Sequence, residues 1–179
     1  AQAASNATPE QVPKLLKDLP RRDMTHTMGF TLAQARFALS DHNLIMQVRS
    51  QDESVKPNPF RPYDGSCVEI FLSPDKKITQ LYVIPGEDRK SVTFKRNNSG
   101  DATPVDAITG TCEPLGDVGY EINVVIPLDL ANIPADFTSF FMETNVIGFF
   151  KGNTAKNTVN IFDAITPFSS TDGCGVLMK

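Results

Sequence analysis

The sequence predicts an all-β fold: one antiparallel β-sandwich of the immunoglobulin-like or jelly-roll kind, preceded by a short N-terminal helix or tail. From Thr27 onward, short segments rich in β-branched and aromatic residues are separated by Pro, Gly, Asn and Asp, a pattern typical of sandwiches. The chain has 179 residues, of which 40% are hydrophobic, including twelve Phe. This length fits one domain with a substantial core that needs no disulfides.

The first 26 residues differ in character from the rest of the chain. Thr8 to Gln11 has the arrangement of a capping box, and residues 14–19 fit one or two helical turns. Pro13 prevents a longer helix. We therefore expect residues 1–26 to form a tail or short helix packed on the body, and residues 27–179 to form the β-sandwich domain.

The predicted strands follow in order, and Asp41-His42-Asn43 gives the strongest hairpin signal. Between the third and fourth strands, residues 54–62 contain three prolines, which predicts a stiff loop that brings Phe60 and Tyr63 to a sheet edge. The expected strands are 27–31, 34–40, 43–50, 67–73, 78–84, 90–95, 105–111, 119–127, 144–151, 158–163 and 174–179.

The most informative segment is residues 63–75, YDGSCVEIFLSPD. In a strand, Val68, Ile70 and Leu72 face one side and form an aliphatic face that belongs to a core. The opposite face carries a carboxylate, Glu69, between a small residue and an aromatic one. A carboxylate in the middle of a strand must be solvated, paired or available to a ligand.

This segment resembles the signature of family 9 carbohydrate-binding modules and their relatives in the DOMON-like superfamily. Residues 41–48 and 119–128 resemble two further strands of that family, in the same order and spacing. Residues 147–149 with Asn153, and residues 174–177, resemble its closing strands more weakly. The matches cover roughly residues 30–179.

The resemblance implies a site in which two aromatic rings hold a terminal sugar and an acid binds its hydroxyls. Tyr63 and Glu69 keep the family's spacing of six residues. Phe168, in a Ser/Thr-rich loop, is the exposed candidate for the second ring, whereas Phe162 alternates in a strand and is expected in the core. The family's usual Trp residues are absent from the whole chain. The expected ligand-binding residues are Tyr63, Glu69, Gln80, Tyr82, Asn153, Asn160 and Phe168.

By this resemblance the expected function is non-catalytic carbohydrate binding, as one module of an exported polysaccharide-acting protein with a catalytic domain in the same chain. The start at AQAAS without Met fits a mature secreted, periplasmic or cell-surface protein, or equally a trimmed one. A net charge of −4 with scattered basic residues argues against nucleic acid. The chain contains no apolar run of about 20 residues, so no membrane-spanning segment is expected.

Enzymatic activity is not expected, because nucleophile and metal-site motifs are missing. Glu69 and Glu121 both lie in predicted strands, but their alternation does not place them in one cleft. No cofactor is expected beyond a structural calcium ion near Asp52 or Asp64. Of the three cysteines, Cys67 is expected to pack as a small side chain, and Cys112 with Cys174 is the better pair if a bridge forms.

Two alternatives remain open at the level of sequence. One is a scaffold or interaction domain that kept the fold without the sugar site. The other is a haem b-binding, electron-transfer domain of the same superfamily, which would need an axial pair of ligands facing one pocket. The residues available for such a pair are Met24, His26, Met28, His42, Met46 and Lys151.

Overall fold

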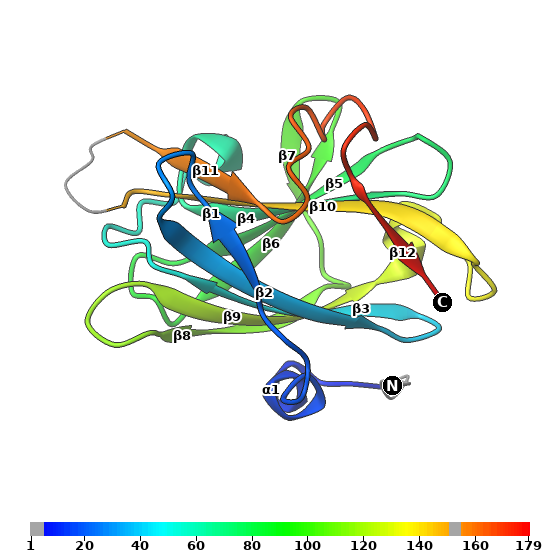
Figure 1. Cartoon of the computed structure of the whole chain (residues 1–179), viewed down its shortest axis with the longest axis horizontal. Helices are drawn as coiled ribbons and strands as arrows, with labels where there is room; N and C mark the ends of the chain where they lie inside the picture. The colour runs from blue at the N-terminus through cyan, green and yellow to red at the C-terminus, as the bar shows by residue number, and fades with distance from the viewer. Residues whose placement is uncertain (1–5, 151–154) are drawn as a thin grey trace.

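The computed structural model, which describes residues 6–150 and 155–179, is a sandwich of two antiparallel β-sheets (Figure 1). The predicted fold class is therefore confirmed. The five-stranded sheet has the order β1-β2-β3-β9-β8, and the seven-stranded sheet has the order β11-β10-β4-β5-β6-β7, with β12 paired to β10. The first sheet comprises β1 (Arg22–Thr25), β2 (Thr31–Leu39), β3 (Asn43–Ser50), β9 (Tyr120–Pro127) and β8 (Thr109–Pro114). The second comprises β11 (Asn157–Asn160), β10 (Ser139–Gly148), β4 (Cys67–Ser73), β5 (Thr79–Pro85), β6 (Val92–Asn98), β7 (Asp101–Pro104) and β12 (Gly175–Met178).

The main core fills the space between the two sheets. Val68, Ile70 and Leu72 of β4 point into it, as their alternation predicts. Glu69 therefore lies on the opposite, outer face of the seven-stranded sheet. This outer face is not bare, because the segment that connects β11 to β12 rises above it (Figure 1).

The N-terminal segment covers the outer face of the other sheet (Figure 1). It forms a short 3₁₀ helix, η1 (Pro9–Gln11), followed by α1 (Val12–Leu15). Val12 and Leu16 pack there against Ile45 of β3 and Val125 of β9. Among the described residues, no helix is long and apolar enough to cross a membrane.

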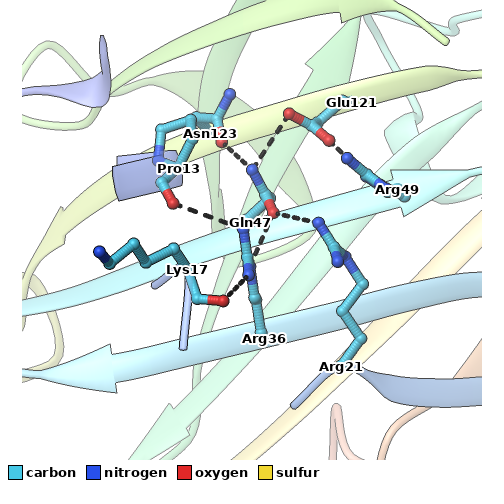
Figure 2. Close-up of polar contacts among 8 residues, drawn as sticks. All are labelled: Pro13, Lys17, Arg21, Arg36, Gln47, Arg49, Glu121 and Asn123. Carbon is cyan, nitrogen blue, oxygen red and sulfur yellow. Dashed lines mark hydrogen bonds and ion pairs between the residues drawn. The ribbon is translucent and has the colours of Figure 1, made fainter. Parts of the chain in front are cut away.

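A buried polar cluster fixes this segment to the sheet, as Figure 2 shows. The guanidinium group of Arg36 donates to the carbonyl oxygens of Lys17 and Pro13, at 3.2 and 3.5 Å. It also donates to Gln47 Oε1 at 2.8 Å, and the Gln47 amide in turn donates to Asn123 Oδ1 at 2.9 Å. The cluster thus links the end of the helical segment to three neighbouring strands.

Some predicted strand limits are wrong. Of the predicted strand 27–31, residues 27–30 form the turn of a hairpin, in which His26 N–H donates to the carbonyl of Phe30 and Gly29 adopts a φ of 87°, and Thr31 begins β2. The strand β1 lies earlier, at Arg22–Thr25, within the segment that was predicted to be a tail. The predicted strand 105–111 corresponds to β8, which begins at Thr109, and β7 precedes it as a separate strand.

All three cysteines are free. Cys67 packs on the outer face against Tyr82, Ile84 and Ile147, so its predicted role as a small packed side chain is confirmed. The conditional pairing of Cys112 with Cys174 is wrong, because both thiols are free; Cys112 lies in β8 of the five-stranded sheet and Cys174 just before β12 of the other sheet.

Candidate functional site

A row of side chains crosses the outer face of the seven-stranded sheet. The strand register places Asn145 of β10 opposite Glu69 of β4, and Glu69 opposite Tyr82 of β5. Gln80 lies two residues before Tyr82 and therefore on the same face. The predicted polar residues of β4 and β5 thus share one surface, and β10 adds an asparagine to it.

Glu69 is the centre of a hydrogen-bond network on this surface. Gln80 Nε2 donates to Glu69 Oε1, and Asn145 Nδ2 donates to Glu69 Oε2, each at 3.0 Å. Asn97 Nδ2 of β6 donates to Gln80 Oε1 at 2.8 Å. Because a carboxylate only accepts hydrogen bonds, the direction of each hydrogen bond in this network is fixed.

The surroundings of Glu69 are largely closed to solvent. Its exposed fraction is 5%, and no ion pair of the described residues includes it. Burial raises the pKa of this carboxyl, while the hydrogen bonds from Asn145 and Gln80 and the charge of Lys156 act in the opposite direction. A buried acid of this kind is expected to need hydrogen-bond partners of its own.

One buried polar atom of the network has no partner in the described part of the chain. Asn145 Oδ1 accepts no hydrogen bond, although the residue is only 8% exposed. Its amide nitrogen is oriented toward Glu69, so the oxygen is the atom left over. Unsatisfied buried acceptors are rare and commonly mark a place for water or a ligand.

The network forms the floor of an open cavity of about 610 Å³. Tyr63, in the 3₁₀ turn η2 (Pro62–Asp64), and Lys156, before β11, line one part of it. The segment between β11 and β12 supplies three further lining residues, Ile165, Pro167 and Phe168. A polar floor with aromatic and apolar side chains around it is typical of small-molecule sites.

The two aromatic residues at this cavity differ in their surroundings. Phe168 is 62% exposed. The ring of Tyr63 is partly buried and lies beneath two cations, with Arg61 Cζ 5.3 Å and Lys156 Nζ 5.9 Å from its centre. Lys156 Nζ is held there by the Tyr63 carbonyl and by Asp64. Phe168 is therefore the more accessible of the two rings.

Five of the seven predicted binding residues line this one cavity: Tyr63, Glu69, Gln80, Tyr82 and Phe168. Asn160 does not line it; its Nδ2 donates to the carbonyl of Ala164 at 3.1 Å. Asn153 lies outside the described residues. Phe162 packs edge to face with Phe37, as expected for a core residue.

Sequence reasoning missed Asn145, Asn97 and Lys156 at this cavity. For Asn145 a signal existed, because it alternates with Ile147 in a strand whose other face is apolar. Asn97 lies at the end of β6, beyond the predicted strand, and Lys156 lies in a loop, so neither position had a periodic signal.

The candidates for calcium have protein partners. Asp52 is buried and accepts hydrogen bonds from the Ser66 hydroxyl and from the N–H groups of Ser54 and Phe149. Asp64 forms ion pairs with Arg61 and Lys156. No group of three or more His, Cys, Asp or Glu residues that would hold a metal ion occurs in the described part of the chain. These carboxylates fit calcium poorly, and the calcium prediction stays untested.

The haem alternative gains no support from the described candidates. Met24 and Met46 are buried in the core, and His42 is exposed in the turn between β2 and β3. His26 and Met28 lie at a separate cavity, where His26 Nδ1 accepts the Met28 N–H at 3.3 Å. Lys151 lies outside the described residues.

Solved structures with a similar architecture include family 9 carbohydrate-binding modules. A family 9 carbohydrate-binding module from Caldicellulosiruptor kristjanssonii in complex with glucose superimposes with a TM-score of 0.73 over 99% of this chain and 93% of that chain, at 15% identity. This chain has the fold of a family 9 carbohydrate-binding module.

Two other structures agree with this family 9 fold. The module from the same organism in complex with cellotriose gives a TM-score of 0.71 at 16% identity and covers 99% of this chain and 91% of that chain. A structure of a protein from Bacteroides uniformis gives a TM-score of 0.67 at 11% identity and covers 99% of this chain and 94% of that chain. No family model and no curated protein sequence matches the chain. The resemblance predicted from sequence motifs is thus confirmed at the level of fold.

Proposed function

We propose that this domain binds carbohydrate without catalysis, in the cavity above Glu69. The observation that carries the proposal is the convergence of Tyr63, Glu69 and Phe168, from three separate segments, on one open cavity. The solved structures with the same fold include a module that holds glucose and one that holds cellotriose. At identities of 15 and 16%, this likeness supports the fold, and the case for binding rests on the residues of this chain.

The floor of the cavity suits a ligand that donates hydrogen bonds. Asn145 Oδ1 has no partner among the described residues, and each oxygen of Glu69 accepts only one hydrogen bond from them. Sugar hydroxyl groups donate to carboxylate and amide oxygens, and bonds to an ionised carboxylate are the stronger ones. Two neighbouring hydroxyls of a pyranose would satisfy these acceptors together.

The aromatic and apolar residues would hold the C–H face of the sugar ring. Aromatic rings bury such surface through their faces, and Phe168 has the exposed ring at this cavity. Tyr63 would contribute through its ring after Arg61 moves, because Arg61 lies over this ring, donates to its hydroxyl at 3.0 Å and is itself exposed. Without Trp, we expect weak binding of a soluble sugar.

By the same proposal, the domain serves as a module of an exported polysaccharide-acting protein, with the catalytic work done elsewhere in the parent chain. Binding should be screened on a glycan array and quantified by calorimetry with glucose and cello-oligosaccharides. Saturable binding without turnover supports the proposal. Hydrolysis of a polysaccharide by the purified domain would overturn it, and lack of binding across many glycans would favour a scaffold.

A further inference from the structure

A second carboxylate of β10, Glu143, is fully buried on the same outer face as Asn145. Its register partner on β4 is Phe71, two residues after Glu69 and therefore on the same face. No ion pair of the described residues includes it. A buried carboxylate without a cation must be satisfied by hydrogen bonds.

The partners of Glu143 are backbone N–H groups of the segment that follows β11. Oε1 accepts from Ile161 at 3.0 Å and from Phe162 at 3.1 Å. Oε2 accepts from Phe162 and from Ala164, each at 3.1 Å. Oε1 also accepts from the N–H of the adjacent Thr144 at 2.7 Å. For Phe162 and Ala164 the side chain therefore replaces the neighbouring strand that their amides lack once β11 has ended at Asn160, whereas the Ile161 N–H also donates to the Thr144 carbonyl of β10 at 3.2 Å.

Other contacts tighten the same turn. Asn160 Nδ2 donates to the carbonyl of Ala164 at 3.1 Å. Asp163, between Phe162 and Ala164, adopts a φ of 66°. At the far end of the segment, a Cβ added to Gly173 would lie 3.1 Å from Ala164 Cα, so the two ends of the segment touch. The turn is thus clamped from three sides.

The residue after this clamped turn is the first of the cavity wall. Ile165 follows Ala164 directly and is 91% exposed, and Pro167 and Phe168 follow within a few residues. Because the wall has little packing of its own at Ile165 and Phe168, its position depends on the turn from which it starts.

We propose that Glu143 is a positioning residue for the sugar site: its carboxylate holds the turn at residues 161–164, and this turn sets the place of the wall formed by Ile165, Pro167 and Phe168. The inference rests on the proposed function for its sugar-binding consequence, and on contacts within the chain for the positioning itself. Glu143 does not line the cavity, so its effect on binding is indirect.

The test uses the absence of Trp from the chain. Phe168→Trp places a single indole in the wall, where acrylamide quenching reports its exposure independently of any sugar. Glu143→Gln is then added to this parent, because the amide keeps the shape but turns N–H groups toward backbone N–H groups. Glu121→Gln, which changes a carboxylate paired with Arg49 on the outer face of the other sheet, is the matched control.

Glu143→Gln is expected to raise the quenching of the indole and to weaken glucose or cellotriose binding by about fivefold or more, the size of a lost charge-assisted contact. Glu121→Gln is expected to change neither. Unchanged quenching in Glu143→Gln would overturn the positioning role, and raised quenching with unchanged affinity would show that the wall does not serve the sugar site. If the parent binds neither sugar, the proposed function fails, and quenching alone decides whether Glu143 holds the wall.

Asn160→Ala covers the case in which Glu143→Gln does not fold. It removes one partly exposed hydrogen bond of the same turn, and its expected effects have the same direction and a smaller size. If Asn160→Ala folds and leaves both quenching and affinity unchanged, the clamped turn does not position the wall.

Discussion

Asn145 Nδ2 lies 3.0 Å from Glu69 Oε2, and this contact determines which atoms the cavity floor offers to a ligand. One N–H of this amide is used within the protein, and its oxygen is left as an acceptor without a partner among the described residues. With Gln80 using both ends of its amide on Glu69 and Asn97, the floor offers acceptors from Asn145 and Glu69. A ligand that fits this floor is one that donates.

Glu69→Gln should weaken sugar binding by about 1 kcal/mol or somewhat more, because a neutral amide replaces a charged acceptor. The NH₂ group of the new amide would also face the side-chain N–H groups of Gln80 or Asn145. Calorimetry with cellotriose measures the change. An unchanged dissociation constant would show that the carboxylate does not touch the sugar.

Asn145→Ala should weaken binding as well, by about 1–3 kcal/mol, since it removes the unpaired acceptor and leaves Glu69 Oε2 without its donor. The same titration gives the affinity, and the thermal midpoint reports any structural cost. Thr158→Ala, a truncation of an exposed residue at the same cavity, serves as the comparison. Equal affinity in Asn145→Ala and wild type would mean that water, not a ligand, satisfies Asn145.

Tyr63→Ala should reduce affinity while lowering the free energy of unfolding by at most about 1 kcal/mol, because the ring is only partly buried. Phe60→Ala is the matched control, since Phe60 is 85% exposed on the preceding loop and does not line the cavity. Affinity and thermal midpoint are measured for both variants. A sharp fall of the midpoint in Tyr63→Ala would assign the ring to the structure.

Binding should weaken as the pH falls from neutrality toward 4.5, the ordinary pKa of Glu69. Burial raises the pKa of Glu69 in the folded protein, so its charge is lost within this range and the acceptor is weakened. The stability contribution of Glu69 has the opposite sign, because a raised folded-state pKa favours folding below the unfolded pKa and loses this effect as the pH rises through the folded pKa. Burial also raises the pKa values of the Asp52 and Glu143 carboxyl groups.

Calorimetric titrations across this pH range check the dependence. Affinity should fall with pH in the wild type and stay nearly flat in Glu69→Gln, whose side chain does not titrate. A parallel fall in both proteins would place the responsible group elsewhere.

Leu16→Ala should destabilise the domain by about 2–5 kcal/mol without changing sugar affinity. Leu16 is fully buried between α1 and the five-stranded sheet, on the opposite side of the sandwich from the cavity. Denaturant unfolding measures the first effect and calorimetry the second. A loss of affinity in the folded variant would mean that the N-terminal segment influences the site.

The sequence identified residues of the cavity floor more readily than those of its wall. Gln80 and Tyr82 were recognisable because alternation places them on one face of a strand, and Glu69 because it interrupts an alternating strand at the spacing of the family signature. Asn145 follows the same rule and lies within the predicted strand 144–151, but its pairing opposite Glu69 depends on the register between two strands that are far apart in the sequence. Phe168 was found from its exposed loop, whereas the role of Asn160 depends on a turn closed by Ala164, which no local pattern encodes.

The fold was predictable for a similar reason, and its misplaced strands have physical causes. Only Met24 of β1 is buried, so the strand has no periodic apolar signal. The apolar residues of 27–31 suggested a strand, but Gly29 with its positive φ makes a turn there, and Met28 and Phe30 remain exposed. Long-range pairing decides such segments, and single-sequence patterns do not contain it.

Amide-resolved NMR during a titration with cellotriose shows directly whether a sugar lies on the Glu69 network. We expect the side-chain NH₂ signals of Asn145 and Gln80 to shift and saturate together, while that of Gln47, in the polar cluster on the opposite sheet, stays in place. Saturating shifts confined to other surfaces, with the Asn145 and Gln80 signals unmoved, would mean that the sugar does not bind at Glu69.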